Sequence, residues 1–106
     1  MAFDIEKINR QVRNYALDVK QLMPIDKAVL FGSFAKGNAT EFSDVDICFF
    51  LKDFNGKKRV ELITELLGLG SKYPEVAFEP LVFSSSEIEN GNPLINEILS
   101  EGIELF

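Results

Sequence analysis

The sequence contains no histidine, one cysteine and no long apolar run. The lack of histidine removes the commonest general base and any histidine-bound zinc site. Cys48 alone cannot form a disulfide within the chain, and its phenylalanine neighbours favour a core position over a nucleophilic role. No segment approaches the roughly 20 apolar residues of a membrane span, and residues 1–10 do not resemble a signal peptide. We expect a soluble, cytoplasmic protein whose chemistry depends on carboxylates.

Basic residues are scarce compared with acidic ones. Eleven lysines and arginines are outnumbered by 17 aspartates and glutamates, which gives a formal net charge of −6. A long polyanion would be repelled unless a metal ion or a partner supplied positive charge, so stand-alone binding of DNA or RNA is not expected. With 106 residues, the chain is expected to form one domain, residues 1–106, around a single core.

The most informative stretch is Phe31–Phe50. The apolar run 28–31 predicts a buried strand, and Gly32-Ser33 turns the chain where that strand ends. Glycine lets an anion approach the backbone, and the amides at the start of a short helix would point donors at phosphate oxygens. The Ser33 hydroxyl adds another donor. This turn is therefore a candidate phosphate-binding element.

Two aspartates flank the start of a second predicted strand, residues 45–51. A side-chain period of two places Asp44, Asp46 and Cys48 on one face of it. Neighbouring carboxylates repel each other and lose solvation when partly buried, so a cation should compensate them. Magnesium suits the pair, because it binds one or two protein carboxylates together with water and phosphate oxygens. A blander interpretation, with Asp44 as a strand-start cap and Asp46 as a solvated edge residue, leaves the Gly-Ser spacing to coincidence.

These residues resemble the signature of the nucleotidyltransferase superfamily related to DNA polymerase beta, in particular its minimal, MNT-type members. Gly32-Ser33 is followed, after ten residues, by Asp44-x-Asp46, and Lys36 occupies the basic position of the family's Gly-Ser-x-Ala-Arg-Gly motif. The resemblance implies that the two aspartates hold magnesium against a nucleoside triphosphate such as ATP. It also implies that Gly32, Ser33 and Lys36 bind the phosphates of that nucleotide.

Glu79 is the exception in an otherwise apolar third predicted strand, residues 76–83. Beside Pro80, it could be a charge on an edge strand. The resemblance offers another role, because the family takes its third metal-binding carboxylate from a strand at this place. Glu79 matches that position and Glu75 is the alternative. In this role Glu79 would hold a second magnesium ion, as in two-metal in-line displacement.

Helices are predicted around these strands. Helical spacing of apolar residues predicts a helix over 4–23 capped by Asp4, and Asn55 is expected to cap a second helix that runs to about residue 71. A capping box at 84–87 begins a short helical turn, and Asn92-Pro93 begins a last helix that Gly102 ends. The buried stripe expected for the second helix comprises Val60, Ile63, Leu66 and Leu67.

Two further segments are candidate contact surfaces. The basic cluster 57–59 is expected to be a solvated face or a partner contact, since it lies far from the carboxylates. The apolar tail 103–106 is expected to pack on the domain or on a partner. The order of elements predicts an α/β (α+β) fold with a small mixed sheet flanked by helices, in which an antiparallel pair carries the site and a crossover leads to the third strand.

We expect the chain to transfer a nucleoside monophosphate, AMP first, from a triphosphate to a hydroxyl group. It has no room for the extra domains with which larger relatives hold their acceptors, so another polypeptide should hold the acceptor or be the acceptor. The resemblance implies a HEPN-type toxin as that partner, an antitoxin role for this chain, and any oligomer formed through the partner. The alternatives are an antitoxin subunit that acts by binding alone, and a transferase for a small molecule or RNA.

Overall fold

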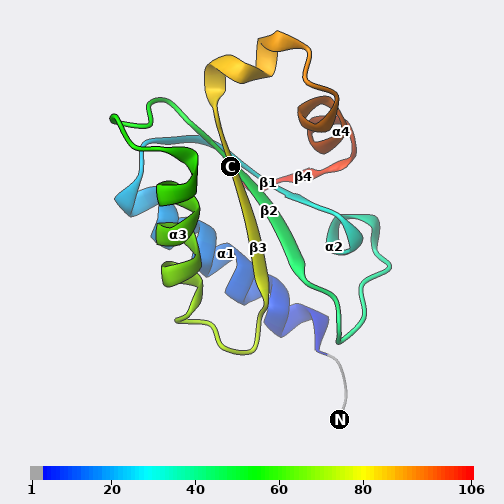
Figure 1. Ribbon diagram of the computed structural model, residues 1–106. Coiled ribbons are helices and arrows are strands. Elements are labelled where there is room, and N and C mark those ends of the chain that lie inside the picture. The colour runs from blue at the N-terminus through cyan, green and yellow to red at the C-terminus, as the bar shows by residue number, and fades with distance from the viewer. Residues whose placement is uncertain (1–3) are drawn as a thin grey trace.

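The computed structural model describes residues 4–106, which form a four-stranded mixed sheet with helices on both faces (Figure 1). The strand order is β3-β2-β1-β4, with β1 antiparallel to both of its neighbours and β2 parallel to β3. This confirms the expected fold class, with its antiparallel pair and its crossover to the third strand. The elements are α1 (Ile5–Leu22), β1 (Ile25–Phe31), α2 (Ser33–Lys36), β2 (Val45–Leu51), α3 (Arg59–Gly70), β3 (Phe78–Ser84), the 3₁₀ helix η1 (Ser85–Asn90), α4 (Pro93–Glu101) and β4 (Ile103–Glu104).

The sheet separates two apolar clusters. On one face α1 and α3 pack against alternate strand residues such as Val45 and Phe49. On the other face α4 and η1 cover Cys48 and Phe50, with Ile95 among the residues packed against them. Both faces of β2 are therefore buried towards its end, while the residues at its start on the α4 side are not. Alternation along β2 thus divides one strand between the core and an open site.

Cys48 is completely buried within the α4-side cluster. Burial, with a smaller contribution from the charge of Glu87, raises the pKa of its thiol to about 12. The thiolate is the nucleophilic form of cysteine, so this side chain is not a nucleophile near neutral pH. The expected core role of Cys48 is confirmed.

The helix caps expected at Asp4, Asn92 and Gly102 are present. The Asp4 carboxylate accepts a hydrogen bond from the Lys7 amide at 3.0 Å, and the Asn92 side chain accepts one from the Leu94 amide at 2.9 Å. Gly102 follows α4 as its C-cap. Each cap satisfies a backbone group that the helix itself leaves unpaired, so these ends are fixed by local sequence.

The prediction for the start of α3 was wrong. Asn55 does not cap this helix; it has a positive φ of 55° in a turn with Gly56, and its amide donates to the Asp53 carboxylate at 2.8 Å. Such an Asx turn holds the backbone away from helical geometry. The helix begins four residues later, after Lys58 as its N-cap.

The predicted buried stripe of α3 was also partly wrong. The buried residues are Leu62, Leu66 and Gly70, whereas the Val60 and Leu67 side chains are 66% and 50% exposed. Tertiary contacts set this rotation. The Tyr15 hydroxyl donates to the carbonyl oxygen of Leu66 at 2.8 Å and stays within the core, and Gly70 lets Phe78 approach α3 closely.

The basic cluster is an exposed face, as one expectation had it, with two of its residues in ion pairs within the domain, whereas the tail packs on the domain. Lys57 pairs with Glu65 at 3.0 Å, and Arg59 pairs with Glu87 at 2.8 Å. The tail contributes β4, a fourth strand that was not predicted, and its last residues continue to exchange backbone hydrogen bonds with Ala28. Among the described helices, none is long and apolar enough to cross a membrane.

Candidate functional site

The site is built where β1 ends beside the start of β2. The antiparallel register places Phe31 opposite Asp46, and Gly32 then turns the chain with φ 70° and ψ −151°. That backbone conformation favours glycine. A Cβ atom at Gly32 would collide with the Asp46 carboxylate. The glycine therefore lets the acidic side chain lie directly against the phosphate-binding turn expected from the sequence.

Three carboxylates converge on one side of this turn. The parallel register of β2 and β3 places Asp46 beside Glu79, and Asp44 precedes Asp46 by two residues on the same face. Hydrogen bonding to Asp46 and then to Asp44, followed by the negative charges of both, raises the pKa of the Glu79 carboxyl. The structure thus brings Asp44, Asp46 and Glu79 into contact.

The donor chemistry of this trio fits a hard divalent cation. Carboxylate oxygens are the ligands that magnesium prefers, and a cation would relieve the repulsion within the trio. The Glu79 carboxyl lies within hydrogen-bonding reach of both aspartates, although within residues 4–106 no group of three histidine, cysteine, aspartate or glutamate side chains is already arranged to hold a metal ion. The fit therefore rests on donor type and proximity.

Glu75, the alternative third carboxylate, is occupied elsewhere. It forms an ion pair with Lys7 of α1 at 2.8 Å, whereas Glu79 lies beside Asp46. β3 is an edge strand, which agrees with the interpretation of Glu79 as an edge charge. Glu79 also lies beside Asp46, which agrees with its interpretation as the third carboxylate of the site. The edge leaves Glu79 exposed, and the register brings it to the aspartates.

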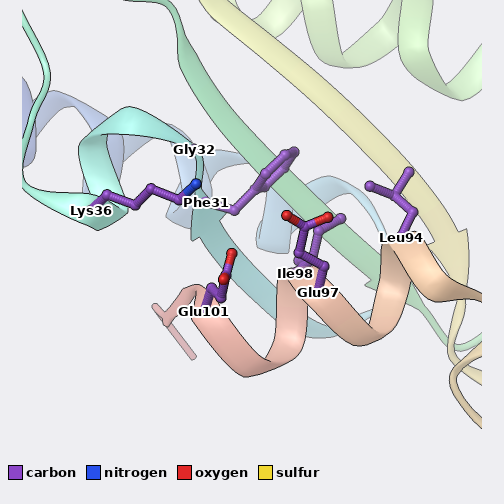
Figure 2. Close-up of a pocket in the computed structure, with 7 residues that line it drawn as sticks. All are labelled: Phe31, Gly32, Lys36, Leu94, Glu97, Ile98 and Glu101. Carbon is purple, nitrogen blue, oxygen red and sulfur yellow. The ribbon is translucent and has the colours of Figure 1, made fainter.

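The two other predicted nucleotide contacts lie on α2. The Ser33 hydroxyl forms no hydrogen bond to any residue in the described chain, and Lys36 has no ion-pair partner there. The Lys36 side chain extends back along α2 towards Gly32 and Phe31 (Figure 2). Both side chains are therefore available to an anionic ligand at the turn.

A cavity of about 120 Å³ lies beside Gly32 and was missed from the sequence. Its far wall is the exposed face of α4, with Glu97 and Glu101 one helical turn apart (Figure 2). That i, i+4 spacing was visible in the sequence, but nothing local places α4 against the end of β1. The lining residues are Phe31, Gly32, Lys36, Leu94, Glu97, Ile98 and Glu101.

Comparison with known proteins agrees with this geometry. Residues 12–104 match the model of the nucleotidyltransferase domain family. A Methanocaldococcus jannaschii protein named "Putative protein adenylyltransferase MJ0141" is 24% identical over 96 residues, which is 89% of this chain and 94% of the relative.

Two solved structures share the fold. A "putative nucleotidyltransferase" from Sulfolobus solfataricus superposes with a TM-score of 0.64 at 16% identity, covering 94% of this chain and 80% of that one. A toxin–antitoxin structure with AMP-PNP gives a TM-score of 0.54 at 19% identity, covering 98% and 73%. The family match spans most of the sequence and includes every residue of the acidic site and of the turn beside it. The chain belongs to the nucleotidyltransferase domain family.

Proposed function

We propose that the protein is a magnesium-dependent nucleotidyltransferase that moves AMP from ATP to a hydroxyl group on a partner polypeptide. The observation that carries this proposal is the contact of three carboxylates, Asp44, Asp46 and Glu79, beside the Gly32-Ser33 turn. A domain that acts only by binding has no need for mutually repelling carboxylates at this turn.

Asp44, Asp46 and Glu79 are the residues that would hold magnesium. When bound, the metal would neutralise charge on the phosphates and lower the pKa of the acceptor hydroxyl. Gly32 permits close approach of the triphosphate to the backbone, and the free Ser33 hydroxyl donates to a phosphate oxygen. Asp44 and Asp46 are expected to hold the ion that binds the triphosphate, and Glu79 is expected to hold the ion that activates the acceptor hydroxyl.

The proposed reaction replaces the phosphoanhydride bond between the α- and β-phosphates with a phosphodiester bond to the acceptor. The acceptor hydroxyl releases its proton to solvent, and its oxygen forms a bond to the α-phosphorus. At the same time the bond from the α-phosphorus to the bridging oxygen of the β-phosphate breaks, and that oxygen leaves with pyrophosphate. Oxidation states do not change, and positioning with charge stabilisation supplies the rate enhancement.

A protein acceptor is favoured by the electrostatics of the chain. The net charge is −6, which repels a polyanion, and Lys57 and Arg59 of the basic cluster are engaged in ion pairs. The relatives point the same way, since one is named as a protein adenylyltransferase and another was solved in a toxin–antitoxin structure with AMP-PNP. We therefore propose a toxin as partner, of the HEPN type that the family resemblance implies, and an antitoxin role for this chain.

Minimal members of the family that this chain resembles are often encoded beside a HEPN-type protein, so the test uses as the acceptor the protein encoded in the reading frame next to this one. After incubation with magnesium, label from [α-³²P]ATP should appear on that polypeptide, while label from [γ-³²P]ATP should appear in pyrophosphate. Intact-mass spectrometry should show the added mass of AMP on the partner. Transfer of the γ-label to the partner would indicate a kinase, and an unmodified partner that is still silenced would favour binding alone.

Glu79→Gln should retain much of the ATP affinity but lower transfer by about a hundredfold or more, because Glu79 is assigned to the acceptor side. Glu75→Gln is the matched control, since it removes the same charge from a group paired with Lys7. Calorimetry with ATP and the labelled-transfer assay measure the two effects separately. Unchanged transfer in Glu79→Gln would assign the third carboxylate elsewhere.

A further inference from the structure

The cavity beside Gly32 is continuous with the proposed phosphate site, because Gly32 lines both. Phe31 lies directly before this glycine, and Lys36 borders the cavity from α2. The opposite wall is α4, whose Glu97 and Glu101 side chains point across the space (Figure 2). A triphosphate held at the turn would therefore place the rest of the nucleotide within reach of this cavity.

The size and the walls of the cavity suit a planar ring. Its volume of about 120 Å³ is close to the ~150 Å³ of a cavity known to hold benzene. Phe31, Leu94 and Ile98 supply an apolar lining. Leu94 is 44% exposed, so the cavity is open at that side and a fused ring can extend outwards. An aromatic side chain at its edge offers a stacking surface, which contributes to base binding in many proteins.

The charges around the cavity select against a phosphate and in favour of an amino group. When ionised, Glu97 and Glu101 can accept hydrogen bonds but cannot donate them, and their negative charges repel anions. An exocyclic amino group donates hydrogen bonds to such carboxylates, whereas a carbonyl at the same ring position cannot. Lys36 at the rim can donate to an unprotonated ring nitrogen.

We infer that this cavity is the subsite for the nucleobase and that its carboxylates select adenine by accepting hydrogen bonds from its 6-amino group. The inference rests on the proposed function and names the substrate base for the same site. Leu94 and Phe31 pack against the ring, and Glu97 with Glu101 accepts from the amino group. When the base carries a carbonyl in place of this amino group, the Glu97 and Glu101 carboxylates lose their hydrogen-bond donor, and this loss provides the specificity.

Inosine triphosphate is the sharpest probe, because it has a carbonyl at C6 and a protonated N1 where ATP has an amino group and an unprotonated N1. Calorimetry with magnesium should show that the wild-type protein binds ATP about tenfold more tightly than inosine triphosphate. The Glu97→Ala, Glu101→Ala double variant should bind ATP about tenfold more weakly and lose this preference. Its affinity for inorganic tripolyphosphate, which has no base, should not fall.

The direction in which ATP affinity changes in the double variant distinguishes hydrogen bonding by the carboxylates from simple charge repulsion. If the carboxylates act only through their charge, removing them should strengthen binding of ATP and of tripolyphosphate alike. Glu89→Ala is the control, since it removes an exposed glutamate that does not line the cavity. Equal wild-type affinity for ATP and inosine triphosphate, or tighter ATP binding by the double variant, would overturn the inference and leave the proposed function standing. Failure of the wild-type protein to bind either ATP or tripolyphosphate with magnesium would instead overturn the proposed function.

Discussion

Asp44→Asn and Asp46→Asn should each remove magnesium-dependent ATP binding and lower nucleotide transfer by about 10³-fold or more. Each substitution keeps the size of the side chain but replaces a charged oxygen ligand with a neutral amide. Magnesium is usually bound through one or two carboxylates, so a neutral amide at either place weakens the site. Asp46 should have the larger effect, because it contacts both Gly32 and Glu79.

Calorimetry with ATP, in magnesium and in EDTA, measures the binding, and the labelled-transfer assay measures the rate. Asp53→Asn is a matched control, because asparagine keeps the side-chain oxygen that accepts from the Asn55 amide while losing the charge. This control should bind and transfer as the wild-type protein does. Equal ATP binding in EDTA, or undiminished binding by the two site variants, would eliminate the metal site.

The same variants distinguish catalysis from binding alone. An antitoxin that acts by covering its partner should silence that partner equally well after Asp44→Asn, because the substitution changes no apolar contact. A transferase should lose its effect together with the modification. Growth of cells that co-express the partner toxin reports this difference, and the intact mass of the partner shows whether the modification accompanies it.

The parts of the fold that sequence predicted correctly are those governed by local physics. Alternation along residues 45–51 depends only on the period of a strand, and it separated the face of Asp44 and Asp46 from the face of Val45. The caps at Asp4 and Asn92 depend on hydrogen bonds within three residues. The trio followed once the family resemblance pointed to Glu79, because the β2–β3 register then completes the group.

The features that sequence did not predict depend on contacts between distant segments. The rotation of α3 follows from contacts with Tyr15 and Phe78, which no pattern within the helix records. β4 has only two residues and exists because β1 offers it a pairing edge. The cavity requires α4 to lie against the end of β1, and Gly102 permits that closeness because a Cβ there would collide with Val29 and with backbone oxygens.

Gly32→Ala should lower nucleotide transfer by about a hundredfold while the protein stays folded. Two costs arise from the added methyl group. A φ of 70° with a ψ of −151° is a backbone conformation that essentially only glycine adopts, so it costs alanine about 1–3 kcal/mol, and the Cβ atom collides with the Asp46 carboxylate. That carboxylate is the end of a movable side chain, so it can rotate away and limit the loss of stability. The rotation takes Asp46 from its place beside Glu79, and a displacement of about 1 Å at a reacting centre can cost about 10²-fold in rate.

Gly37→Ala is the control variant, because it places alanine at a positive φ without a collision between its Cβ atom and a carboxylate. Gly37 also has a positive φ, 78°, but its ψ of 14° lies in the left-handed helical region, and a Cβ atom there would meet no heavy atom within 4 Å. Gly37→Ala should therefore lower the melting temperature, measured by circular dichroism, but by less than Gly32→Ala, whose backbone conformation is less accessible to alanine. Only Gly32→Ala should lose transfer and magnesium-dependent ATP binding, because only there does the methyl group displace a carboxylate. Equal activity in the two variants would mean that the contact between Gly32 and Asp46 does not position the site.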